Sequence, residues 1–169
     1  MNFYGKVHNV SYIGMRFFTI YGPWGRPDMA YFKFTKNILN NKKIEVFNHG
    51  NHLRDFTYVD DVVKSVYLTI KKIPQKKNKA SISNSKNAPF TILNIGGGKK
   101  VKLMDFIKEI EKNLSIKAKI KFLPLQQGDV LQTSCDTRKI KKYINFVPKT
   151  SHKTGIKKFV DWYRSYYKK

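Results

Sequence analysis

Two runs of the chain are almost continuously apolar and β-branched, the pattern of strands buried on both faces of a parallel sheet. The first spans residues 10–20 and the second spans residues 90–95. Tyr21-Gly22-Pro23 follows the first run, and Gly96-Gly97-Gly98 follows the second. Because glycine and proline interrupt regular structure, both strands are expected to end there.

Other segments repeat their apolar residues at helical spacing. Four helices are expected. The first opens at Pro27-Asp28, and the second runs from Asp60 to about Lys72. The third contains the apolar stripe Leu103, Phe106, Ile107, Ile110 and Leu114, and the fourth runs from about Thr154 to Tyr167. Asp28 and Asp60 are suitable N-caps, because a carboxylate accepts the free N–H groups of the first turn.

Shorter elements fill the spaces between these strands and helices. Extended backbone is expected at residues 44–47, 54–59 and 118–124, a short helix at 136–143, and a flexible polar loop at 74–87. Strands that alternate with helices predict an α/β fold.

The net charge of +23, from 34 basic and 11 acidic residues, leaves two interpretations open. One is a surface for nucleic acid or anionic lipid. The other is compositional drift toward lysine, with a modest role in steering an anionic substrate. Only five of the basic residues are arginine, the residue that leads base-edge recognition, and the lysines are scattered. The composition therefore favours drift over a dedicated nucleic-acid partner.

For the few residues suited to metal or thiol chemistry, an ordinary structural or surface role is expected. His49 and His52 are spaced H-x-x-H, but Asp55 is the only acidic residue close to them, so we expect surface histidines and no metal site. Cys135 is the only cysteine and has no histidine nearby, which indicates a buried structural thiol. A single cysteine and the lack of a membrane-length apolar run are typical of a cytoplasmic protein. Gly96-Gly97-Gly98 lacks the G-x-G-x-x-G spacing of a phosphate loop and is expected to be a plain turn.

Three motifs resemble the NAD-dependent nucleotide-sugar epimerases and dehydratases of the extended short-chain dehydrogenase class. They are the run from Met15 to Met29 (MRFFTIYGPWGRPDM), the run from Arg54 to Asp61 (RDFTYVDD), and the turn from Gln126 to Val130 (QQGDV). The first is most similar to the UDP-glucuronate 4-epimerase group. From chemistry alone, Arg54 could equally pair with Asp55 or Asp60.

The resemblance implies a site for a UDP-sugar. The expected substrate contacts are Thr19 and Arg26 with the sugar carboxylate, Phe47 with uracil through its backbone, Arg54 and Gln126 with the diphosphate, and Asp129 in the same nucleotide-binding turn. Tyr21 and Pro23 match the loop near the nicotinamide of NAD. Many relatives have arginine at the position of Gln126, so Arg54 should supply most of the positive charge there. Arg26 as a plain solvated loop residue remains the alternative.

The resemblance covers only the family's second half. It implies the C-terminal part of a Rossmann-type doubly wound parallel sheet, from residues 1–28 and 58–98, and a small α/β substrate-binding domain, from residues 29–57 and 99–169. The family's glycine-rich turn does not occur here, and neither early tyrosine, Tyr4 or Tyr12, has a lysine four residues later. We therefore expect no catalytic residues, no retained NAD and no activity by this chain alone.

Partners and alternatives follow from the same resemblance. A separately encoded N-terminal half is a possible partner, and the intact family is often homodimeric. The alternatives are a fragment of another nucleotide-sugar epimerase or of a 4,6-dehydratase and, from a different class, a basic module that binds nucleic acid.

Overall fold

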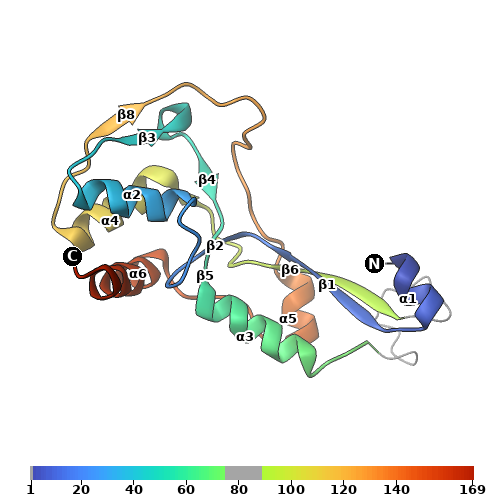
Figure 1. Cartoon of the computed structure of the whole chain (residues 1–169). Coiled ribbons are helices and arrows are strands. Elements are labelled where there is room, and N and C mark those ends of the chain that lie inside the picture. Colours follow the sequence, from blue (N-terminus) through green and yellow to red (C-terminus); the bar gives the residue numbers. More distant parts are fainter. Residues whose placement is uncertain (1, 75–88) are drawn as a thin grey trace.

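The computed structural model describes residues 2–74 and 89–169 (Figure 1). The loop predicted for residues 74–87 lies outside these ranges, except for Pro74. The helices are α1 (Asn2–His8), α2 (Ala30–Leu39), α3 (Val59–Ile70), α4 (Leu103–Leu114), α5 (Arg138–Ile144) and α6 (His152–Tyr167), with a 3-10 turn η1 (Phe47–Gly50). The strands are β1 (Tyr12–Phe17), β2 (Thr19–Tyr21), β3 (Ile44–Val46), β4 (Leu53–Arg54), β5 (Phe56–Tyr58), β6 (Phe90–Ile95), β7 (Val101–Lys102) and β8 (Ile120–Phe122).

The first long apolar run forms two strands that pair with different partners. β1 pairs with β6 and β2 pairs with β5, both in parallel. The change occurs at Phe18, whose N–H donates to the carbonyl of Ile95 (3.1 Å), while the next N–H, of Thr19, donates to the carbonyl of Asp55 (3.2 Å). The predicted parallel strands are thus confirmed, and residues 12–21 form a continuous segment that joins the β1–β6 pair to the β2–β5 pair.

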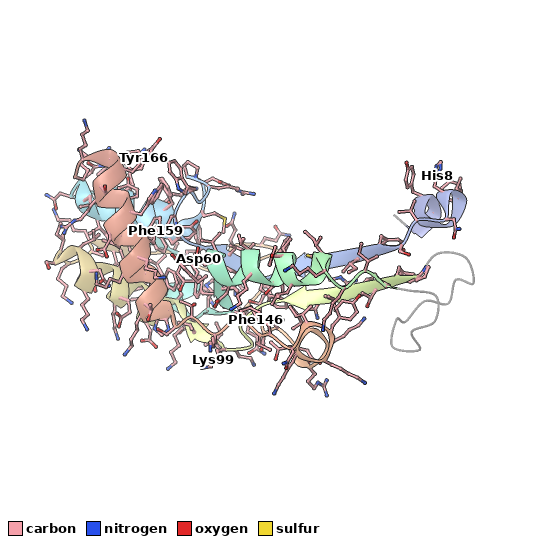
Figure 2. All side chains as sticks on the ribbon, turned by 90° about the horizontal axis from the view of Figure 1, so that it is seen from below. His8, Asp60, Lys99, Phe146, Phe159 and Tyr166 are labelled. Carbon is pink, nitrogen blue, oxygen red and sulfur yellow. The ribbon has the colours of Figure 1, made fainter. Side chains whose placement is uncertain are left out.

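β1 and β6 form an extended ribbon that carries α1 at its far end, with α3 and α5 along it (Figure 1 and, from below, Figure 2). We call this part the arm. Because side chains alternate along a strand, one face of the ribbon presents Leu93 and Ile95, which pack with Val62, Ile140 and Ile144 of the two helices. The opposite face includes Ile92, which is 37% exposed. Parallel sheets normally have both faces covered, so this face is where further structure would pack.

The other part, the body, packs α2, α4 and α6 around a core that is half aromatic and half aliphatic, with the β3–β8 pair beside them (Figure 1). The predicted stripe on α4 is confirmed, because Phe106, Ile107, Ile110 and Leu114 are all buried. Helix α6 approaches β2 so closely that a Cβ atom at Gly155 would lie 2.1 Å from the Tyr21 hydroxyl oxygen. Only glycine fits at that crossing.

The predicted helix caps are wrong. α2 begins after Met29 and α3 after Tyr58, and neither helix has a side-chain cap. The acidic residues bind elsewhere: Asp28 pairs with Arg26, and Asp61, next to the expected cap Asp60, accepts hydrogen bonds from two backbone N–H groups of the segment before α6. Asp28 thus pairs with a residue two positions earlier and Asp61 with a distant segment, and neither carboxylate closes the first turn of a helix.

A single buried carboxylate, that of Asp55, ties the arm to the body. Asp55 is fully buried. Its carboxylate accepts the N–H groups of Gly97 (3.0 Å), Gly98 (2.8 Å) and Cys135 (2.9 Å), and the hydroxyl of Thr57. The glycine turn after β6 is thus a structural turn that wraps a protein carboxylate.

The predicted division into residues 1–28 with 58–98 and residues 29–57 with 99–169 stays a prediction. Two separate clusters of buried apolar residues are compatible with two units. Helix α5 belongs to the arm's cluster through Ile140 and Ile144, although its sequence falls in the second unit. Under this division, α5 would serve as a contact between the units.

We expect Asp55→Asn to lower the free energy of unfolding by about 2–3 kcal/mol, because the amide turns a donor toward backbone N–H groups that need an acceptor. Urea unfolding followed by circular dichroism measures the loss. Asp161→Asn, an exposed change on α6, is the matched control and should stay within about 0.5 kcal/mol. Equal stability of the two variants would contradict the role given to Asp55.

We also expect the chain alone to self-associate or to melt without cooperativity. Large apolar side chains are exposed on the arm: Phe3, Tyr4 and Val7 of α1, Phe17 of β1, and Val63, Tyr67 and Ile70 of α3. Exposed apolar surface of this kind promotes association. Size-exclusion chromatography with thermal melting tests this, and a clean monomer with a sharp melt would contradict it.

Candidate functional site

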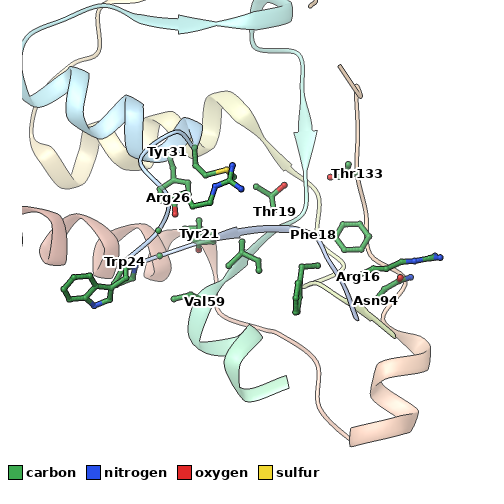
Figure 3. Close-up of a pocket in the computed structure, with 16 residues that line it drawn as sticks. Arg16, Phe18, Thr19, Tyr21, Trp24, Arg26, Tyr31, Val59, Asn94 and Thr133 are labelled. Atoms are coloured by element: carbon green, nitrogen blue, oxygen red, sulfur yellow. The ribbon is translucent and has the colours of Figure 1, made fainter. Parts of the chain in front are cut away.

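Two adjoining cavities flank strand β2, and Thr19 lines both of them. The first, of about 920 Å³, follows β2 and the loop toward α2 (Figure 3). The second, of about 630 Å³, lies among α2, β3, β4 and the start of α4. Seven of the eight residues predicted to bind substrate or cofactor line these cavities: Thr19, Tyr21, Pro23, Arg26, Phe47, Arg54 and Asp129.

The first cavity contains the predicted carboxylate-binding pair. Figure 3 shows the Arg26 side chain extending toward Thr19. Arg26 is 73% exposed, and its Nε donates to Asp28 Oδ1 (3.0 Å) while its Nη2 donates to the other oxygen. Hydrogen bonding to Arg26 lowers the pKa of Asp28. Arg26 is therefore solvated, but its guanidinium makes a bidentate ion pair with a carboxylate, the geometry expected of a carboxylate-binding arginine.

Tyr21 and Pro23, predicted to lie near the nicotinamide, also line the first cavity. The Tyr21 ring is fully buried among aromatic residues, edge-on to Phe106 and Tyr58. Burial, together with the nearby Tyr58 and Asp61, raises the pKa of Tyr21. A cofactor contact at Tyr21 would thus involve its backbone, and the contact remains a prediction.

The second cavity is built around one carboxylate that lies between Arg54 and His52. Arg54 Nη2 donates to Asp129 Oδ1 (2.9 Å), and His52 Nε2 lies 2.9 Å from Asp129 Oδ2. The alternative pairing of Arg54 with Asp55 or Asp60 is not the one found: the Asp55 carboxylate is turned toward backbone N–H groups, and Lys158 lies 3.8 Å from Asp60. The partner comes from 75 residues further along the chain.

The remaining predicted substrate residues divide between lining and non-lining positions. Phe47 is half-buried and lines the second cavity. Gln126 is exposed and does not line either cavity, although its carbonyl accepts the N–H of Asp129 (3.1 Å) and so shapes the turn that carries Asp129. The structure thus brings together Thr19, Phe47, Arg54 and Asp129, and leaves the Gln126 side chain outside.

His52 is the residue that the sequence analysis misjudged. It was expected at the surface, yet it is 5% exposed and lines the second cavity. The sequence held one signal, since residues two apart in an extended segment share a face and His52 precedes Arg54 by two. In residues 2–74 and 89–169, no group of three His, Cys, Asp or Glu side chains is placed so that it could hold a metal ion. In the same ranges, no helix is long and apolar enough to span a membrane.

Comparison with known proteins shows which family the chain resembles. A family model described as NAD dependent epimerase/dehydratase matches residues 2–95, more than half of the chain. The chain belongs to this family. Relatives within the epimerase/dehydratase family include Protein CapI of Staphylococcus aureus, 46% identical over 98% of this chain, and a probable UDP-glucuronate 4-epimerase of Rhizobium meliloti, 40% identical over 98% of it. The chain covers 51% and 50% of these two relatives, or about half of their length.

The fold agrees with solved epimerase structures. UDP-glucuronic acid 4-epimerase from Bacillus cereus, in complex with UDP-glucuronic acid and NAD, superposes with a TM-score of 0.83 at 30% identity. The match covers 98% of this chain and 49% of that one. The predicted fold class, part of a Rossmann-type sheet with a smaller α/β part, is therefore confirmed.

Cys135 is buried close to the Asp55 junction, as predicted for a structural thiol. Burial, with smaller contributions from Asp55 and Asp136, raises the pKa of Cys135 to about 12. The thiol therefore stays protonated near neutral pH, and only the thiolate is nucleophilic.

We expect Ellman's reagent to modify Cys135 at pH 8 at least about a hundredfold more slowly in the folded chain than in denaturant. The rate should rise with pH up to the raised pKa of Cys135, because a larger fraction of the thiol is ionised to thiolate at higher pH. Since the chain has one cysteine, the absorbance change reports it alone. Equal rates with and without denaturant would show that the thiol is accessible and ionisable.

Proposed function

We propose that this chain is the nucleotide-sugar-binding part of a UDP-glucuronate 4-epimerase-like enzyme, which interconverts UDP-glucuronate and UDP-galacturonate through a 4-keto intermediate. The observation that carries the proposal is the placement of two arginines, Arg26 and Arg54, in adjoining cavities on either side of Thr19. A UDP-sugar acid carries two anionic groups, a diphosphate and a carboxylate, separated by one sugar ring. Two arginines with a hydroxyl between them match that order.

The second cavity supports the nucleotide end of the substrate. Arg54 offers a planar guanidinium that is 17% exposed, and a partly buried guanidinium binds phosphate more strongly than a solvated one. Asp129 on the facing turn can accept hydroxyl hydrogens, and Phe47 lies at the end of β3 as a wall for the base. Gln126 contributes no charge, so Arg54 provides the main phosphate contact.

The lining of the first cavity favours a sugar that carries a carboxylate. In the free protein, Arg26 binds the Asp28 carboxylate through both Nε and Nη2, and Thr19 adds a neutral hydroxyl beside it. A substrate carboxylate can replace that of Asp28 with the same geometry. Surface pairs contribute little to stability, so the exchange costs the protein little.

The chain's residues fit only part of an NAD site. Phe18, Ile20 and Pro23 give the first cavity an apolar wall suited to one face of a flat ring. The family's glycine-rich turn, which would seat the pyrophosphate, is not in the 169 residues. NAD supplies the hydride acceptor for sugar C4 when bound, and we expect the chain alone neither to retain it nor to catalyse.

The uncovered face of the arm supports the presence of a cofactor-binding half. Relatives of about twice this length are similar to the chain over one half, and the exposed apolar residues of α1, β1 and α3 gather on the arm. We propose that the relatives' other half, in the same polypeptide or as a separate one, covers this surface and completes the parallel sheet.

We expect Arg26→Ala to penalise UDP-glucuronate far more than UDP-glucose in an enzyme completed with a relative's cofactor-binding half. The substrates differ at C6, where only the acid offers a carboxylate. A charge-assisted hydrogen bond is worth about 1.5–3 kcal/mol, so kcat/KM for the acid should fall by about ten- to a hundredfold. Steady-state kinetics with both sugars measures the difference.

Two control variants sharpen this test. Arg54→Ala should weaken both sugars alike, because both carry the same diphosphate. Arg138→Ala removes another exposed arginine that grips an aspartate two residues away, but it lies outside both cavities and should leave kinetics unchanged. Equal losses for both sugars on removal of Arg26 would mean that Arg26 does not read the carboxylate.

A further inference from the structure

His52 is a buried polar side chain with an incomplete environment. It is 5% exposed and lines the second cavity. Its Nε2 lies 2.9 Å from Asp129 Oδ2, yet no partner meets it with hydrogen-bond geometry, so this nitrogen is buried without a hydrogen bond. A buried polar atom left in this way destabilises the fold. The chain therefore keeps a group here that folding does not require.

Charged side chains face this nitrogen from several elements. Asp129 is the nearest, and Arg54 holds that carboxylate from the other side. The remaining charged residues that line the same cavity are Asp28, Lys33, Lys43, Glu45 and Lys121. Glu45 and Lys121 pair with each other (3.2 Å). Asp129 is thus the acceptor closest to His52.

Arg54 uses only part of its hydrogen-bonding capacity inside the protein. Its Nη1 donates to the carbonyl of Leu53 (3.3 Å) and its Nη2 donates to Asp129, which leaves further N–H groups for a ligand. A diphosphate that binds those N–H groups repels the Asp129 carboxylate at close range. The carboxylate then stays in the cavity only if a donor on its other side holds it.

We propose that His52 is that donor. The inference rests on the proposed nucleotide site and deepens it: when the diphosphate takes Arg54, the Asp129 carboxylate turns until the Nε2–H of His52 meets Oδ2 in line. His52 is then a positioning residue that holds Asp129 inside the cavity, where it can accept a hydroxyl hydrogen of the nucleotide. The separation of 2.9 Å means that reorientation is sufficient and no translation of the backbone is needed.

Calorimetric titration of the chain with UDP tests the proposal. His52→Leu keeps the volume and removes the donor, so UDP affinity should fall by about five- to tenfold. His52→Gln keeps an N–H donor and should remain within about twofold of the wild type. In an Asp129→Asn background, His52→Leu should cause no further loss, because paired residues show non-additive effects.

Thermal melting separates positioning from a merely structural role. His52→Leu should keep or raise Tm, since it removes an unsatisfied buried nitrogen, while it weakens UDP binding. A structural histidine would lower Tm on replacement. His152→Leu, a change of the same type at the start of α6 outside both cavities, should alter neither Tm nor affinity.

The outcomes distinguish the two proposals. Unchanged UDP affinity in His52→Leu, failure of Gln to rescue, or equal losses with and without Asp129 would overturn the role of His52 and leave the nucleotide site in place. Failure of the wild-type chain to bind UDP at all would overturn the nucleotide site, and the role of His52 with it.

Discussion

The Asp55 carboxylate is the contact on which the relative placement of arm and body depends. It is fully buried and accepts three backbone N–H groups, two from the turn after β6 and one from Cys135. A buried charge is tolerated only when hydrogen bonds replace its lost hydration, and three N–H donors do this. Gly96 permits the close approach, since a Cβ there would lie 2.6 Å from that of Cys135.

The same residue determines where the first long strand changes partner. The carbonyl of Asp55 accepts the N–H of Thr19, immediately after Phe18 has made the last bond to β6. Thr19 is thereby fixed at the point where the arm ends and the body begins, with a cavity on each side. The two cavities thus lie at a junction, where two cores supply their walls.

The sequence predicts local elements well and long-range pairing poorly. Apolar periodicity gave the strand at 90–95, the stripe on α4 and most of α6, because each is decided by which residues must be buried. It could not show the break at Phe18, which depends on hydrogen bonds to segments more than 30 residues away. The predicted caps at Asp28 and Asp60 failed because these carboxylates have other partners: Arg26, two residues away, pairs with Asp28, and Lys158 lies 3.8 Å from Asp60.

The candidate site shows the same division. Motif resemblance led to Thr19, Arg26 and Arg54, and the structure gathers them around two adjoining cavities. The pairing of Arg54 with Asp129 was beyond sequence reasoning, because it links residues 75 apart, and nearer aspartates were the plausible partners. His52 was misjudged because a loop histidine is usually solvated, and its burial follows from how β4 is enclosed.

Both arginines of the site are held by the protein's own carboxylates, Arg26 by Asp28 and Arg54 by Asp129. These pairs keep each guanidinium extended and oriented, so less side-chain entropy is lost when a ligand arrives. Because the Arg26 pair is largely solvated, it contributes little to stability and a ligand anion can replace Asp28 readily. The Arg54 pair is less exposed, so its exchange is harder unless the displaced carboxylate finds another donor. The two carboxylates differ accordingly in their surroundings: Asp129 has His52 Nε2 2.9 Å from its second oxygen, whereas Asp28 is 59% exposed and can return to water.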